Sequence, residues 1–115
     1  QQMYMKIYTS YKFNPLDYYV HINKKFPNQE TLKKIEKEVY NSLDKVLNQR
    51  LLDISKKFNV PYLNFEEIQC NQNDKSCKLL TPDGYKIYWD PIHITEEGAK
   101  YLGKKIKKLD WFKSN

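Results

Sequence analysis

Glycine is scarce in this sequence: three of 115 residues are glycine, which excludes a glycine-rich phosphate-binding loop. A run of about 20 apolar residues is also lacking, so no segment is expected to span a bilayer as a helix. The first residues show no signal-peptide pattern. Because residue 1 is Gln rather than Met, we expect the chain to begin inside a longer protein, and these absences do not decide its location.

Cysteine is limited to Cys70 and Cys77, seven positions apart in a polar stretch. The two histidines, His21 and His93, are not spaced to complete a metal site, and the redox spacing Cys-x-x-Cys is absent. A local disulfide between Cys70 and Cys77 fits best, and it would indicate an oxidising compartment. A pair of free thiols in a cytosolic loop is the alternative. We expect no metal and no cofactor.

The charge balance is basic, with a formal net charge of +6 and a pI near 9.2. Most lysines are interleaved with acidic residues, which is typical of a solvated surface; attraction to an anionic polymer or a membrane is the alternative. The concentrated basic cluster consists of Lys104, Lys105, Lys107 and Lys108. No recognised nucleic-acid-binding motif accompanies it, so we expect no nucleic-acid partner.

Apolar residues at steps of three and four predict a long amphipathic helix over residues 29–58. A helix of this length is unusual in a globular protein, so a break near Asn48–Gln49 is an alternative, and Asn59 is expected to end the helix. A free coiled-coil helix is a further alternative. The apolar run Val60–Phe65 favours instead a buried strand on which the helix packs, with Asn64 placed to cap a short turn.

Other short stretches favour β-structure. Residues 3–13 predict a strand, and residues 16–22, after the turn signal Asn14-Pro15, predict a short strand or an irregular aromatic segment. Two β-prone runs, 77–81 and 85–89, flank the sequence Thr-Pro-Asp-Gly, which predicts a hairpin.

The segment WDPIHITEEG, residues 89–98, holds the strongest candidate for chemistry, with Asp90 and His93 three positions apart in a loop. A helix is predicted over residues 96–108, because Thr95 is a good N-cap and acidic residues follow it. A histidine can take the proton of a hydroxyl nucleophile, and a carboxylate on its other ring nitrogen holds the ring in place. An ordinary surface pair is the alternative. His21 is expected to be a packed or surface residue.

Residues 90–102, DPIHITEEGAKYL, resemble the last motif block of the SGNH (GDSL-like) hydrolase superfamily, in which an Asp-x-x-His pair precedes a helix opening in a Thr/Ser-x-x-Gly-Ala pattern. The order of long helix, Val-Pro-Tyr-Leu strand and cysteine loop also resembles the SGNH domains at the C-terminus of acyltransferase-3 type membrane proteins. The resemblance is close over residues 85–103 and looser over residues 29–109.

By this resemblance, His93 is the base and Asp90 its orienting partner in a Ser-His-Asp triad. The family's Gly-Asp-Ser nucleophile block and its Gly and Asn oxyanion donors are not matched. The serines are Ser10, Ser42, Ser55, Ser76 and Ser114, and none follows Gly-Asp. The chain thus resembles the C-terminal portion of a three-layer α/β/α, flavodoxin-like domain. We expect residues 1–115 to form one domain, with helices on a small, mainly parallel sheet plus a hairpin.

The resemblance implies a serine-type esterase or O-acyltransferase that transfers an acyl group, expected to be acetyl, to a carbohydrate or removes it. It also implies an extracytoplasmic domain joined to a membrane acyltransferase domain in the same protein. By itself, the chain is expected to have little activity, because it lacks an evident nucleophile. The alternatives are a non-catalytic basic α/β module that binds an anionic glycan, a membrane surface or a partner protein, and a degenerate SGNH fold kept for structure.

Overall fold

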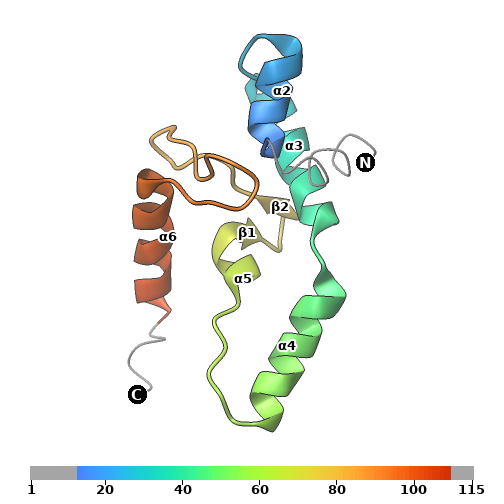
Figure 1. Ribbon diagram of the computed structural model, residues 1–115, viewed down its shortest axis with the longest axis vertical. Helices are drawn as coiled ribbons and strands as arrows, with labels where there is room; N and C mark the ends of the chain where they lie inside the picture. Colours follow the sequence, from blue (N-terminus) through green and yellow to red (C-terminus); the bar gives the residue numbers. More distant parts are fainter. Residues whose placement is uncertain (1–12, 110–115) are drawn as a thin grey trace.

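The computed structural model describes residues 13–109. In chain order its elements are α2 (Pro15–Asn23), α3 (Gln29–Ser42), α4 (Lys45–Lys57), α5 (Phe65–Gln69), β1 (Cys70–Asn71), β2 (Ser76–Cys77) and α6 (Glu96–Lys108). In the view of Figure 1, α2 and α3 lie together at one end, and α5 with the short sheet lies between α4 and α6. The mixture of helices with a small sheet confirms an α/β class.

The sheet within residues 13–109 is antiparallel, with Cys70 paired to Cys77 and Asn71 to Ser76. The expected mainly parallel sheet is not present in this part of the chain. The predicted strand over residues 60–65 was wrong: residues 60–64 form no strand, and Asn64 instead caps α5 by accepting a hydrogen bond from the N–H of Glu66. A parallel strand needs a partner far away in sequence. The strand predicted for residues 3–13 falls almost wholly outside the described residues.

Helix capping decides two further elements. Residues 16–22 lie in α2, not in a strand, because Asn14 accepts a hydrogen bond from the N–H of Asp17 at 2.9 Å and Pro15 suits the first turn. The predicted long helix is divided at Leu43 and Asp44, earlier than expected, because Asp44 caps α4 by accepting from the N–H of Leu47. Local hydrogen bonds at these caps outweigh the β-prone and helical periodicities.

The disulfide between Cys70 and Cys77 forms as predicted. It joins β1 to β2, which together form the cysteine hairpin. Both cysteines are buried in the first of two core clusters. The buried members of this cluster are Leu16, Ile35, Val39, Tyr40, Cys70, Cys77 and Leu79. The buried carboxylate of Glu36 accepts a hydrogen bond from the N–H of Leu79 and so fastens α3 to the chain after β2. By contrast, α4 contributes no buried side chain, and Val46, Leu47 and Phe58 are exposed.

Ile87 is the centre of the second core cluster, with Ile68 and Leu102. Its N–H donates to the carbonyl oxygen of Leu79 at 3.0 Å, and its own carbonyl oxygen accepts from the N–H of Thr95 at 2.9 Å. The predicted hairpin turn is present, closed by Leu80 paired with Lys86, but extended strands do not form around it. These bonds link the cysteine hairpin to the start of α6.

The last helix has the predicted bounds, and Thr95 caps it by accepting from the N–H of Gly98 at 2.9 Å. Gly98 lies directly on the backbone of Ile87, where a Cβ would come within 2.5 Å of the Ile87 carbonyl oxygen. Gly103, five residues further along α6, has open space where its Cβ would lie. Glycine is therefore required at residue 98 by close packing of helix on backbone.

We expect Gly98→Ala to lower the free energy of unfolding by about 1–3 kcal/mol, because the new methyl group overpacks a backbone contact. Gly103→Ala is the matched control and should raise it by about 0.5–1 kcal/mol through helix propensity alone. Urea unfolding followed by circular dichroism measures both. Equal stability of the two variants would contradict the close contact at Ile87.

Replacing Cys70 and Cys77 together by Ser should lower the free energy of unfolding by roughly 2–3 kcal/mol, the loop-closure contribution of so short a loop. A reducing agent should bring the native chain to the level of this variant and leave the variant itself unchanged. Stability that does not respond to the reductant would show that the disulfide is absent in solution.

Candidate active site

The loop between Ile87 and Thr95 is closed by the side chain of Asp90. One carboxylate oxygen, Oδ1, accepts from the backbone N–H of Ile92 at 2.9 Å and of His93 at 2.6 Å. The N–H of Trp89 donates to the carbonyl oxygen of His93 at 3.1 Å. The loop thus holds its shape through its own short-range hydrogen bonds, as an Asx turn does.

The same carboxylate also contacts the imidazole. Its second oxygen, Oδ2, lies 2.6 Å from Nδ1 of His93. An ionised carboxylate only accepts hydrogen bonds, so Nδ1 carries the hydrogen and Nε2 of the neutral ring is left as an acceptor. The side chain of His93 is 59% exposed, and that of Asp90 is 20% exposed. The structure therefore brings together the two residues singled out from the sequence, with the free ring nitrogen accessible.

Hydrogen bonding sets the electrostatics of Asp90. Partial desolvation of the carboxylate favours its neutral form, but the backbone N–H groups of His93 and Ile92 and the His93 ring together outweigh it. The net result is that the pKa of Asp90 is lowered from its ordinary value of 3.8. Asp90 is consequently ionised throughout the neutral pH range, as the orienting partner of a histidine base must be.

Trp89 was not predicted as part of the site. Its ring stacks on that of His93, with centroids 5.2 Å apart and an interplanar angle of 22°. The Trp89 side chain is nevertheless largely exposed, so it presents a flat apolar surface beside the imidazole. Its position directly before Asp90 was the only sequence signal, because the stacking depends on how the Asx turn reverses the chain.

The N-terminal end of this loop is held to the rest of the molecule by Tyr88. Its carbonyl oxygen accepts from the side-chain amide of buried Asn14, at 3.0 Å, and its hydroxyl donates to Gln69 at 2.7 Å. On this side, Pro91, Ile92 and Ile94 help to line an apolar pocket of about 360 Å³. An apolar hollow therefore adjoins the loop that carries the pair.

None of the serines in residues 13–109 is bonded to His93. The hydroxyl groups of Ser42 and Ser55 donate to carbonyl oxygens of their own helices, and that of buried Ser76 donates to Asp74. Ser10 and Ser114 lie outside the described residues. Residues 13–109 thus place an imidazole against a carboxylate, with no serine hydroxyl hydrogen-bonded to the pair.

A family model described as "SGNH domain (fused to AT3 domains)" matches residues 9–108, nearly the whole chain. The chain belongs to this SGNH family. Membership supports a hydrolase or acyltransferase type of function, with a membrane acyltransferase (AT3) domain as its partner in the protein. Comparisons with curated proteins and with solved structures gave no match. Within residues 13–109, no helix is long and apolar enough to cross a membrane.

Lowering the pH should dissociate the pair only in strongly acidic solution. Because the pKa of Asp90 is lowered, its bonds to the loop persist at neutral pH and are lost as the pH falls through a value below 3.8. The carboxyl ¹³C signal of Asp90, followed by NMR, should titrate below 3.8. His93→Gln, which keeps the backbone donors but removes the ring, should move this pKa upward. A midpoint at or above 3.8 in the native chain would contradict the observed hydrogen bonding.

Proposed function

We propose that this SGNH domain takes part in serine-type ester chemistry, with His93 as the general base and Asp90 as the residue that orients it. The observation that carries the proposal is the 2.6 Å contact between Oδ2 of Asp90 and Nδ1 of His93, which leaves Nε2 exposed. This is the geometry in which a histidine can accept a proton from an approaching hydroxyl.

In the proposed reaction, Nε2 of His93 removes the proton of a serine hydroxyl while its oxygen attacks the ester carbonyl. The negative charge of Asp90 stabilises the imidazolium that forms. The imidazolium then gives its proton to the departing alkoxide, and an acyl-serine remains. Water attacks the acyl-serine in hydrolysis, whereas a carbohydrate hydroxyl attacks it in transfer. In either case His93 takes the proton of the attacking group and returns it to the serine oxygen as the acyl–serine bond breaks.

The serine and the oxyanion donors of this scheme are proposed to come from outside residues 13–109. Ser42, Ser55 and Ser76 are engaged elsewhere, so the described residues contribute the Asp-His half of a triad. The exposure of the His93 side chain supports this division, because another segment can reach an exposed ring.

For the substrate we propose an O-acyl, in particular O-acetyl, ester of a carbohydrate. The exposed ring of Trp89 supports this choice, since a flat aromatic face beside the base is suited to stacking on a sugar ring. The disulfide supports an extracytoplasmic location, where such bonds persist, and the family supports attachment to a membrane acyltransferase domain.

His93→Ala in the complete protein should lower kcat/KM by at least about a thousandfold, as loss of a triad histidine does. Two substrates should be used, p-nitrophenyl acetate and an O-acetylated sugar, so that hydrolysis and carbohydrate preference are measured together.

The matched control is His21→Ala. His21 is an exposed residue of α2 that stacks on Phe13 and makes no ion pair or hydrogen bond with Asp90 or His93, so its replacement should leave both rates unchanged. Unchanged turnover in His93→Ala would show that His93 is not the general base. Equal losses in the two variants would indicate damage to folding instead of chemistry.

A further inference from the structure

A stripe of lysines runs along α6 on the side away from the core. At 100° per residue, Lys100, Lys104, Lys107 and Lys108 fall within an arc of about 100° on the helix, whereas buried Leu102 lies on the opposite side. All four lysines are exposed. The stripe extends over roughly 12 Å along the helix axis.

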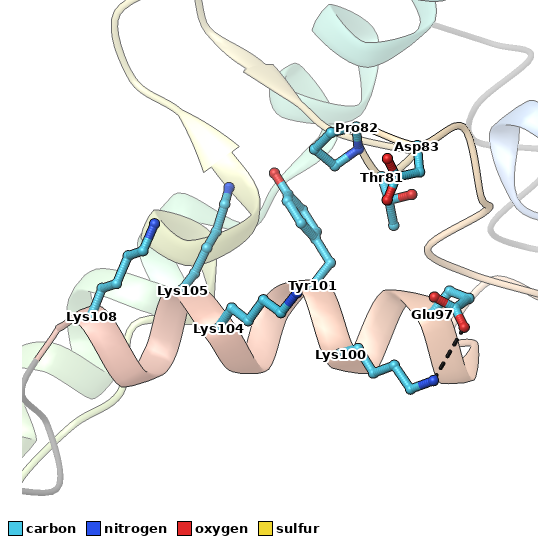
Figure 2. Close-up of a pocket in the computed structure, with 9 residues that line it drawn as sticks. All are labelled: Thr81, Pro82, Asp83, Glu97, Lys100, Tyr101, Lys104, Lys105 and Lys108. Atoms are coloured by element: carbon cyan, nitrogen blue, oxygen red, sulfur yellow. Dashed lines mark hydrogen bonds and ion pairs between the residues drawn. The ribbon is translucent and has the colours of Figure 1, made fainter.

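A pocket of about 320 Å³ lies between this helix and the Thr81–Asp83 turn. Figure 2 shows Lys104, Lys105 and Lys108 along the helix, with Tyr101 reaching toward the turn. Thr81, which is buried, accepts from the N–H of Tyr85 with its hydroxyl oxygen, so its hydroxyl hydrogen is available to a ligand. The pocket therefore offers ammonium groups and a hydroxyl donor together.

Some of these lysines already have partners. Lys100 lies 3.1 Å from Glu96 and 3.3 Å from Glu97, and Lys105 donates to the carbonyl oxygen of Ile68 at 3.0 Å. By contrast, Lys104 and Lys108 make no ion pair or hydrogen bond with the described residues. They are four positions apart, where two like charges repel one another along a helix.

Two carboxylates also line the pocket. Glu97 is paired with Lys100, and Asp83 stands exposed on the turn, so four lysines against two acids leave a positive surplus. The negative end of the helix dipole accounts for lysines in the last turn of α6, but not for Lys104, which precedes that turn. An anion in the pocket would account for both unpaired lysines.

We propose that this lysine pocket binds the phosphate of an anionic lipid head group, so that α6 lies against a membrane surface. The family places this domain in proteins with a membrane acyltransferase domain, which keeps it close to a bilayer. A stripe of exposed lysines on one side of a helix suits an anionic membrane surface, which attracts basic residues. This proposal does not depend on the chemistry of Asp90 and His93.

Sedimentation with vesicles of equal parts phosphatidylglycerol and phosphatidylcholine tests the proposal on the 115-residue chain. The native chain should bind these vesicles, bind pure phosphatidylcholine vesicles far less, and lose affinity steeply with salt. Lys104→Gln with Lys108→Gln should weaken binding by about 25-fold, or roughly fivefold per lysine. Glutamine is a good helix former, and circular dichroism checks that α6 is retained.

The matched control is Lys25→Gln with Lys37→Gln. It removes the same charge from two exposed lysines that lie outside α6 and make no ion pair with the described residues. It should bind nearly as the native chain does. Equal losses of vesicle affinity in both double variants would show that binding depends on total charge, and would contradict a specific role for the lysine pocket. Failure of the native chain to bind the anionic vesicles would overturn the proposal that α6 lies against a membrane.

Two soluble probes distinguish other sources of the anion. If the chain binds dextran sulfate but not the anionic vesicles, the partner is a polysaccharide and the proposal is wrong. If inorganic phosphate displaces the chain from vesicles no better than sodium chloride of equal ionic strength, the head group in its bilayer is supported. Saturable binding of free phosphate without any binding to vesicles would identify a soluble ligand instead.

Discussion

The backbone of Ile87 is the point on which the C-terminal half of the molecule depends. Its two hydrogen bonds reach Leu79 on one side and Thr95 on the other, and Gly98 lies directly against it. Its side chain is fully buried. Because one residue joins the cysteine hairpin, the candidate loop and α6, a shift of its backbone would displace both ends of the loop. Close packing of this kind tolerates no added methyl group, which is why residue 98 is glycine.

These contacts of Ile87 hold the Asp90–His93 pair in place. With the ends of the loop held near Ile87, the carboxylate of Asp90 satisfies two backbone donors and the ring of His93 at once. The ring is further confined by Trp89. A pair held in place before a substrate arrives requires little rearrangement, which suits the role in proton transfer that we propose for it. The basic stripe of α6 begins just beyond the helix cap, so the same contacts of Ile87 also position the lysine pocket.

Much of this could be predicted from the sequence wherever a few neighbouring residues decide the outcome. The bounds of the last helix, the caps at Asn64 and Thr95 and the disulfide follow from short-range chemistry. Short-range hydrogen bonds also explain why the expected strand over residues 16–22 and the undivided helix over residues 29–58 were wrong. Asn14 and Asp44 are caps as well, and their local hydrogen bonds override the β-prone and periodic patterns around them. The pairing of Asp90 with His93 was predictable, because an Asx turn brings residues three apart into contact.

The sequence by itself determined the last helix, the disulfide, the family and the two residues of the pair, since each rests on contacts within a few positions or on a short motif. Only the tertiary structure decided that residues 60–64 form no strand, that Gly98 meets Ile87, and that Trp89 covers one face of His93. The physical reason is that a strand, a close backbone contact and a stacked ring each need a partner whose position is set by the folded chain. No spacing along the sequence specifies that position.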